Sequence, residues 1–548
     1  MVQMNFELNK KYIIALPALA ALIIALIPTI KYYWPLGWDI FYHIQYAQVY
    51  TQYGFILTDP QLNAPIGRKI AYPPLFHFLI AGIGSFLSVD YFQVARFLQP
   101  LFAMSIVLSV SYVAYKFYGE LAGLGAGFMI LSSYLLGRII LPLPENLALI
   151  FLPLAVCLYY LSIKNENLKT AFFGGILLMA VILTHQGATL CLILTIVAIT
   201  ILEIFFTRNI SVLKNFTLFF LALILTIFAG IIYLLISSPA LFHNILGQGI
   251  TSITGMSTSL PLNRSIGIFS YLGNLSILVL IFSMIGGISI VKKLHTKNIE
   301  RKDMVILVWI VTMFLLSNAY WFGINVISYR VLIYLLIPLS ILGGYGLSRV
   351  YQKIKNNGRL SSQKMHTVFV VAFVCLALLS GILTVENPKI GVYGVKNQEG
   401  FVQTAPPSES EVDLARWFTE NGNSSRYVVI SNQFTGMFLA AETNMSFRNG
   451  FKYYSTNINV PVEEKSRKSV NNHTLSFFKE KNVGYVVYDK RLVISPEEKT
   501  LALRVIDTEF FSLHYFTQDI HSNINRIKNE FARVVYENND FIVCEINW

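Results

Sequence analysis

The chain has 548 residues, of which 55% are hydrophobic and 13% are charged, and its formal net charge is +12. Soluble domains carry about 25% charged residues, so this composition excludes an ordinary soluble protein and indicates a multi-pass membrane protein. The basic residues lie mainly in short segments between apolar runs, which argues against nucleic-acid binding. The four cysteines show no pairing or metal-ligand spacing, so we expect no disulfide framework.

Apolar runs long enough to cross about 30 Å of hydrocarbon recur along the first 385 residues. The first run is read as a retained span because no small-residue cleavage site follows it. Residues 73–89 begin with two prolines and include His77, which favours an interfacial segment in the first loop. The predicted spans are about eleven: 12–30, 93–115, 119–137, 146–163, 169–184, 187–206, 215–237, 266–291, 304–320, 329–349 and 366–385.

The charge distribution predicts the orientation of these spans. With a cytoplasmic N-terminus and an interfacial 73–89 segment, the basic segments 292–302 and 349–364 lie on the cytoplasmic side. If 73–89 crosses the membrane instead, both segments face outward, against the positive-inside bias. We expect the first arrangement, which leaves four carboxylates of the membrane domain on the outer side before Glu386: Asp39, Asp59, Asp90 and Glu145.

The composition changes after residue 385 to a polar segment with strand and helix patterns. Ser410 and Asp413 predict a capped helix that stops at Gly422. Residues 427–430 and 483–488 read as buried strands, and 533–536 with 541–544 read as a terminal hairpin. The predicted organisation is therefore a transmembrane domain over 1–385 and an extracytoplasmic mixed α/β domain over 386–548.

Three segments carry a resemblance to a known family. These are WDIFYH at 38–43, the stretch from Gly137-Arg138 through PENL at 144–147 to Phe151-Leu152-Pro153, and SYRVLIY at 328–334. In order and spacing they resemble the GT-C superfamily of membrane glycosyltransferases, especially the catalytic subunit of oligosaccharyltransferase. The resemblance implies transfer of a sugar from a polyprenyl-phosphate or polyprenyl-diphosphate donor on the outer face.

The resemblance places Asp39 at the first-loop acid of the family's active site. A carboxylate there can take the proton of an acceptor that attacks the anomeric carbon. The alternative is that Asp39 only caps a helix over 40–53.

Glu145 and Asn146 occupy the place where oligosaccharyltransferases carry paired acids for a divalent cation. A metal site of Asp39, Glu145 and Asn146 holding Mn²⁺ or Mg²⁺ is therefore one expectation, and a metal-free site is the other. Pro144 followed by Glu145 and Asn146 is also typical of a helix N-terminus, where the acid complements the dipole.

Arg330 stands where the family uses an arginine to hold the lipid-linked phosphate, and Arg138 and Arg264 are further candidates for that contact. The alternative for Arg330 is a snorkelling side chain at the headgroups.

Other polar residues lie at the outer ends of spans. His185 and Gln186 interrupt an apolar stretch and are expected to reach the donor phosphate or sugar, as are His43 and Tyr42 in the first loop. Each also fits an interfacial anchor.

Two departures from the family shape the predicted reaction. The loop 238–265 contains no acid, and residues 386–548 contain no Trp-Trp-Asp motif. The sequence therefore favours transfer of a single sugar to a glycan, lipid or protein acceptor. The alternatives are an oligosaccharyltransferase-like enzyme and, from another class, a flippase or exporter of lipid-linked saccharides, although a transporter would carry charges inside its spans.

Overall fold

The computed structural model describes residues 10–70, 72–208, 210–237, 239, 266–322, 328–356, 363–386, 406–430, 432–449, 479–480, 482–492 and 532–547. The chain divides into two compact units, which are described separately below. The helical unit comprises residues up to Tyr33, Tyr72–Phe76 and Phe97–Val392. The mixed unit comprises Trp34–Ala71, His77–Arg96 and the residues from Tyr393 onward.

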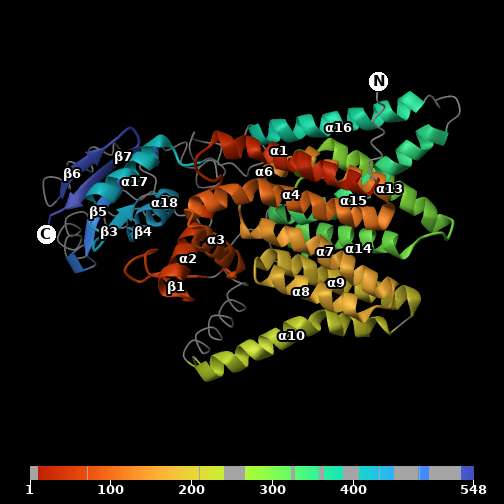
Figure 1. The fold of residues 1–548 in the computed structure, drawn as a ribbon, viewed down its shortest axis with the longest axis horizontal. Coiled ribbons are helices and arrows are strands. Elements are labelled where there is room, and N and C mark those ends of the chain that lie inside the picture. The colour runs from red at the N-terminus through yellow and green to blue at the C-terminus, as the bar shows by residue number, and fades with distance from the viewer. Residues whose placement is uncertain are drawn as a thin grey trace. The chain divides into compact units, whose positions relative to one another are not determined.

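The helical unit is built from the apolar runs, and most of its long helices lie side by side with roughly aligned axes (Figure 1). Its elements are η1 (Lys10–Ala15), α1 (Leu16–Lys31), most of α4 (Tyr91–Tyr118), α5 (Glu120–Ser132), α6 (Leu136–Ile139), α7 (Pro144–Lys164), α8 (Leu168–Ile182), α9 (Gln186–Thr207), α10 (Val212–Ser237), α12 (Ile268–Leu275), α13 (Ile277–His295), α14 (Arg301–Ser317), η2 (Ala319–Phe322), α15 (Ser328–Asn356) and α16 (Gln363–Glu386).

Among the described residues, 8 helices are long and apolar enough to cross a membrane, in α1, α4, α7, α9, α10, α13, α15 and α16. The predicted spans 119–137, 169–184 and 304–320 form the shorter helices α5, α8 and α14. Helix α3 (Leu75–Leu87) has 13 residues. This is the same length as α5, so the length of α3 does not by itself separate an interfacial segment from a short span, and its interfacial placement stays a prediction.

The predicted span 266–291 is wrong as one continuous helix. It divides at Ser276, whose φ of 71° ends α12 and whose hydroxyl accepts from the Val279 N–H to start α13. A serine in an apolar run resembles an ordinary helical residue, yet its side chain can replace a backbone partner and end a helix. The span 119–137 likewise ends early, at Ser132.

Small residues let α15 approach its neighbours closely. A Cβ on Gly344 would lie 2.2 Å from the Ala122 carbonyl oxygen of α5, and one on Gly346 would lie 2.0 Å from the Phe282 carbonyl oxygen of α13. Membrane helices use such small residues because lipid gives little hydrophobic drive for helix association. This packing fixes the position of α15, which carries two residues of the site described below.

The mixed unit joins the first loop to the C-terminal sheet. The loop forms α2 (Asp39–Tyr53), the strands β1 (Thr58–Asp59) and β2 (Arg68–Lys69), and most of α3. Phe41 of α2 packs edge to face on Phe438, with ring centroids 5.2 Å apart. The Phe447 N–H donates to the Gln61 carbonyl at 2.9 Å, and the Ala64 N–H donates to the Phe447 carbonyl at 3.0 Å. The loop therefore extends the edge of the sheet.

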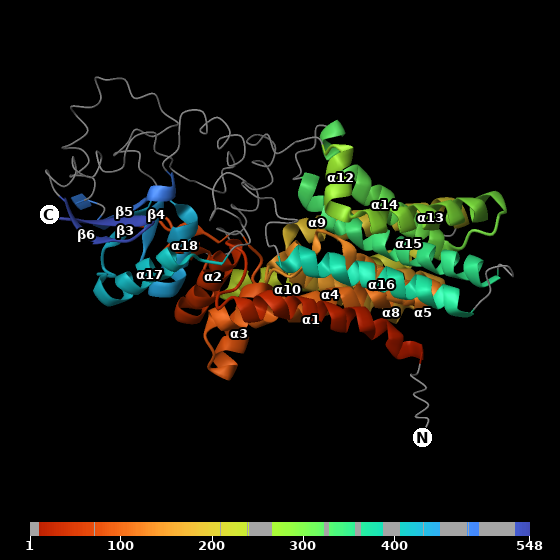
Figure 2. The same cartoon turned by 90° about the horizontal axis from the view of Figure 1, so that it is seen from above.

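The sheet has the strand order β4-β3-β5-β7-β6, with α17 (Glu409–Asn421) and α18 (Gln433–Thr443) packed on it (Figure 2). Strands β3 (Tyr427–Ile430), β4 (Phe447–Asn449) and β5 (Val483–Asp489) are parallel, and β6 (Ala532–Glu537) and β7 (Phe541–Ile546) form an antiparallel hairpin. The predicted strands, hairpin and mixed α/β class are confirmed. The predicted cap is wrong by two residues, because Ser408 forms the capping box of α17 with Glu411.

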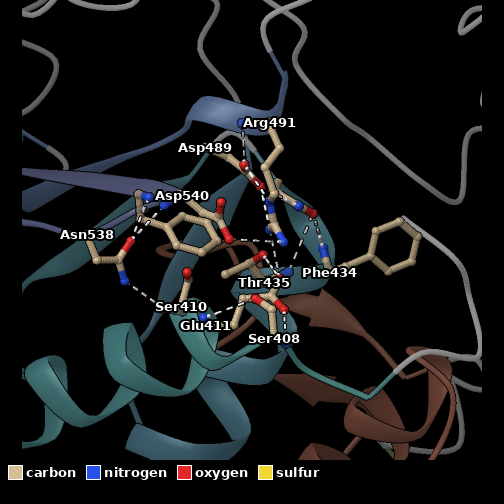
Figure 3. A network of polar contacts seen from close by, with 11 residues as sticks. Ser408, Ser410, Glu411, Phe434, Thr435, Asp489, Arg491, Asn538 and Asp540 are labelled. Carbon is tan, nitrogen blue, oxygen red and sulfur yellow. Dashed lines mark hydrogen bonds and ion pairs between the residues drawn. The ribbon is translucent and has the colours of Figure 1, made fainter. Parts of the chain in front are cut away.

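A buried ion-pair network ties these elements together (Figure 3). The Arg491 guanidinium, in η4 (Lys490–Leu492), donates to Asp489 at 2.8 Å and to Glu411 at 2.9 Å. Asp489 also accepts from Asn432, which caps α18. Because each buried charge has a partner, the network holds α17, α18 and the end of β5 in one arrangement.

Candidate functional site

The turn between α6 and α7 places an arginine and a glutamate side by side. Leu143 is extended and Pro144 is the first residue of α7, where a missing N–H costs nothing. Oε2 of Glu145 accepts from Nε of Arg138 at 2.8 Å and also from its Nη2. The Asn146 amide donates to the carbonyl oxygens of Arg138 and Leu141, both at 2.7 Å. The turn therefore fixes this ion pair, and Glu145 begins a helix as its alternative interpretation predicted.

The turn between α8 and α9 contributes His185. This residue is the N-cap of α9, and its Nδ1 accepts from the Ala188 N–H at 3.2 Å. Gln186 is the first residue of α9 and is exposed, and Gly187 leaves room for the ring, since a Cβ there would lie 3.1 Å from Cε1 of His185. The imidazole is therefore held at the helix start, half-buried.

Helix α15 completes the cluster. Arg330 lies in its first turn, and Tyr334 is one turn further along the same face. The Tyr334 hydroxyl lies 3.0 Å from Oε1 of Glu145 and 3.2 Å from Nδ1 of His185. Arg330 is within electrostatic range of both Glu145 and His185.

Three residues that the sequence singled out, Arg138, Glu145 and His185, are thus joined directly or through Tyr334, and Arg330 lies within electrostatic range of them. We name Arg138, Glu145, His185, Arg330 and Tyr334 the polar cluster. Two guanidinium groups and one carboxylate give the polar cluster a formal charge of +1 when His185 is neutral. Because Glu145 is paired with Arg138, the site as a whole favours an anion, and Arg330 provides a planar fork of donors for it.

Glu145 and Asn146, the α7 residues of the predicted metal site, already have hydrogen-bond partners in the protein. Oε2 of Glu145 faces the Arg138 guanidinium, and Oε1 faces the Tyr334 hydroxyl. The Asn146 amide nitrogen is engaged in the turn. Within the described ranges, no group of three or more His, Cys, Asp or Glu side chains is placed to hold a metal ion. Glu145 in this arrangement does not fit a cation ligand, so we derive no step through a metal.

Asp39 lies in the mixed unit as the first residue of α2. The N-cap is Trp38 and no side chain caps this helix, so the alternative that Asp39 is its cap is wrong, although the charge of Asp39 lies in the first turn. The residue is half-buried. One turn further along α2, His43 is buried, and its Nδ1 lies 2.9 Å from Nε2 of His77 on α3. Burial lowers the pKa of His77 to about 3, so this partner of His43 is neutral.

The remaining first-loop residues have structural contacts. The Arg68 guanidinium lies over the Tyr42 ring, 4.5 Å from its centroid. Asp59 is buried at the end of β1, and its Oδ1 accepts from the Gln61 N–H at 2.8 Å. Asp90 accepts from backbone N–H groups at the start of α4 and so caps this helix. Arg264 lies outside the described residues.

Sequence reasoning did not identify Tyr334 as a site residue. It lies within the 328–334 motif, four residues after Arg330 and therefore on the same helix face. A buried tyrosine in an apolar helix has the same pattern as a packing residue. Its spacing from Arg330 was the signal that could have found it.

Comparisons with known proteins give a consistent class of fold. The sequence matches no protein-family model, and no curated protein matches it. The structure is similar to the Archaeoglobus fulgidus oligosaccharyltransferase in its apo form, with TM-score 0.63 and 14% identity over 97% of this chain and 80% of that chain.

Two further solved structures share this fold. ArnT from Cupriavidus metallidurans, bound to undecaprenyl phosphate, has TM-score 0.56 and 13% identity over 97% of both chains. The mycobacterial arabinofuranosyltransferase AftD has TM-score 0.55 and 11% identity over 99% of this chain and 40% of that chain. The chain is therefore a multi-pass membrane protein with the GT-C fold, and the predicted fold class is confirmed.

Proposed function

We propose that this chain is a membrane glycosyltransferase that moves a sugar from a polyprenyl-phosphate-linked donor to an acceptor on the extracytoplasmic face. The observation that carries the proposal is the polar cluster. It gathers two arginines, a histidine and a tyrosine around one paired glutamate at the starts of α7, α9 and α15. A GT-C neighbour, ArnT, has been solved with undecaprenyl phosphate, and an anion of that kind suits the charge of the polar cluster.

The donor phosphate is the part of the substrate that the polar cluster fits. Arg330 would hold it through a bidentate guanidinium contact, which is stronger and more directional than a lysine contact. As the bond between the anomeric carbon and the phosphate oxygen breaks, its electron pair stays on the phosphate. Positive charge placed there beforehand stabilises that developing charge.

Asp39 would act on the acceptor. Its carboxylate takes the acceptor proton while the acceptor atom forms its bond to the anomeric carbon, and the polyprenyl phosphate leaves. His43, Tyr42 and Gln186 remain predicted donor contacts. A single transferred sugar fits the departures of the sequence from oligosaccharyltransferases better than transfer of a whole glycan to protein.

The proposed reaction also needs an orientation. We propose a cytoplasmic N-terminus, a transmembrane domain over 1–385 and an extracytoplasmic domain over 386–548. In support, basic residues are concentrated at one end of the helical unit, in the last turns of α13 and α15, whereas the polar cluster lies at the starts of α7 and α15.

The proposal is tested with the purified full chain in detergent and a panel of polyprenyl-phosphate-linked monosaccharides, with membrane lipid extract as the source of acceptor. We expect release of free polyprenyl phosphate, which reports cleavage of the donor whatever the acceptor is. Asp90→Asn, a change at a capping carboxylate, should retain this release and serves as the control. Movement of intact donor across vesicles without any cleavage would contradict the proposal in favour of a flippase.

A further inference from the structure

The hydrogen bonds around His185 determine which ring nitrogen carries its proton. The Ala188 N–H can only donate, and it points at Nδ1 of His185 at 3.2 Å. Nδ1 must therefore present its lone pair. In the neutral ring the proton is then on Nε2, at the opposite edge of the imidazole.

The Tyr334 hydroxyl lies between this lone pair and a buried carboxylate. It is 3.2 Å from Nδ1 of His185 and 3.0 Å from Oε1 of Glu145, and Tyr334 is 2% exposed. A hydroxyl has one proton to donate and two lone pairs to accept with. The hydroxyl donates its proton to Oε1 of Glu145, so this carboxylate oxygen has a donor without a proton on Nδ1 of His185.

Without that hydroxyl, the ring would have a different preferred state. A carboxylate is a stronger acceptor than a neutral group, because a hydrogen bond to a charged group contributes more than one between neutral groups. A protonated Nδ1 directed at Glu145 would therefore compete with the backbone bond from Ala188. The N–H on Nε2 would then be lost from a neutral ring.

We infer that Tyr334 is a positioning residue, whose hydroxyl separates Glu145 from His185 and keeps the His185 proton on Nε2, where it donates to a phosphate oxygen of the donor. The inference rests on the proposed function for the identity of the ligand. The arrangement of the ring itself does not depend on that function, so the two can fail separately.

The first measurement determines directly which ring nitrogen of His185 carries the proton. The full chain is labelled with ¹⁵N-histidine and purified in detergent, and the His185 signals among the 9 histidines are assigned with His185→Asn. We expect an unprotonated Nδ1 and a protonated Nε2 in the wild type, and a proton on Nδ1 in Tyr334→Phe. A proton on Nδ1 in the wild type, or an unchanged ring in Tyr334→Phe, overturns the inference.

The second measurement reads the consequence for binding, with undecaprenyl phosphate as the probe. Tyr334→Phe should weaken its binding roughly tenfold, the loss expected for one hydrogen bond to a charged group. In a His185→Asn background the same change should have less than a twofold effect, because the donor is already absent while asparagine still caps α9.

A matched control separates this coupling from a general loss of stability. Tyr159→Phe also removes a buried tyrosine hydroxyl of α7, one bonded to Thr200, and should leave probe binding unchanged in both backgrounds. An equal loss from Tyr334→Phe with and without His185 overturns the inference. If the wild type does not bind the probe at all, the proposed function fails, and the ring measurement decides the inference by itself.

Discussion

Arg138 and Glu145 face each other across the turn from α6 to α7, with Nε of Arg138 2.8 Å from Oε2 of Glu145 and side chains that are 14% and 4% exposed. A buried pair of this kind contributes little net stability, yet breaking it leaves an uncompensated charge. The pair also sets the charge that a ligand meets, because Glu145 is already neutralised and Arg330 is the second cation of the polar cluster.

Replacing Glu145 with alanine should therefore destabilise the protein strongly. The loss expected for leaving Arg138 buried without its partner is about 3–5 kcal/mol. Glu145→Gln retains an acceptor for Arg138 and should cost less. The measurement is thermal unfolding in detergent, with Arg416→Ala as the control, because that residue forms an exposed pair with Asp413 that should contribute about 0–1 kcal/mol. Equal midpoints for Glu145→Ala and wild type would show that the pair is not held in this way.

Arg330→Lys should weaken use of the donor. Lysine keeps the charge but cannot supply two parallel N–H contacts to one phosphate, so we expect a roughly tenfold higher donor concentration for half-maximal rate. The control is Arg349→Lys, at the other end of the same helix, where the guanidinium donates to Gln352 at 3.2 Å. Identical donor titrations for Arg330→Lys and wild type would assign Arg330 to a snorkelling role.

The raised pKa of the buried Asp59 carboxyl group predicts a pH dependence of stability. Burial raises its pKa to about 6, despite hydrogen bonds from the Gln61 and Leu62 N–H groups. The folded state therefore holds a proton that the unfolded state releases at lower pH, so the contribution of Asp59 to stability should fall as pH rises from about 4 to 6.

Asp59→Asn removes that dependence, since asparagine has no proton to lose and can still accept from Gln61. The difference in unfolding midpoint between variant and wild type, in favour of the variant, should grow from pH 4 to pH 6 and then stay constant. The measurement is a set of thermal scans across this range. A difference that does not change with pH would mean that Asp59 titrates near its ordinary value.

Much of the polar cluster was predictable because its members stand where apolar runs begin. Arg138, Glu145, His185 and Arg330 are polar residues at the ends of apolar runs, and the bilayer restricts such residues to those places. Their positions along the chain follow from hydropathy. Their convergence does not, because it depends on how α7, α9 and α15 pack against one another.

Other features depend on which of several nearby residues ends or caps a helix, and a single sequence does not determine this. Ser276 ends α12 through its positive φ and caps α13 through its side chain. Ser408 rather than Ser410 caps α17, although each of these two serines stands three residues before an acid. Tyr334 is an apolar-face residue by pattern, and only its contacts with Glu145 and His185 distinguish it from a packing tyrosine.

The proposed orientation predicts that the residues from 406 onward lie outside the membrane. Protease added to sealed right-side-out vesicles should remove this region, and protease sealed inside them should not. An engineered protease site in the 292–302 segment, predicted to be cytoplasmic, provides the opposite control. Cleavage of the C-terminal region only from the cytoplasmic side would reverse the topology and the site with it.

The last prediction concerns Asp39, which is proposed to accept the acceptor proton. Asp39→Asn keeps the size of the side chain and much of its hydrogen bonding, but it removes the basicity that proton transfer requires. Loss of a general base costs about 10²–10⁴-fold in rate. Loss of a favourable charge at the first turn of α2 would cost only about 0.3–1 kcal/mol of stability.

The two roles of Asp39 therefore separate in one variant. If it is the base, Asp39→Asn inserts and unfolds near the wild-type temperature, binds undecaprenyl phosphate normally and releases polyprenyl phosphate from the donor at less than about 1% of the wild-type rate. The control is Asp90→Asn, which changes a carboxylate that accepts from the start of α4 and should retain the rate. Near-normal turnover by well-folded Asp39→Asn would remove Asp39 from the mechanism and leave the acceptor to be activated by another group.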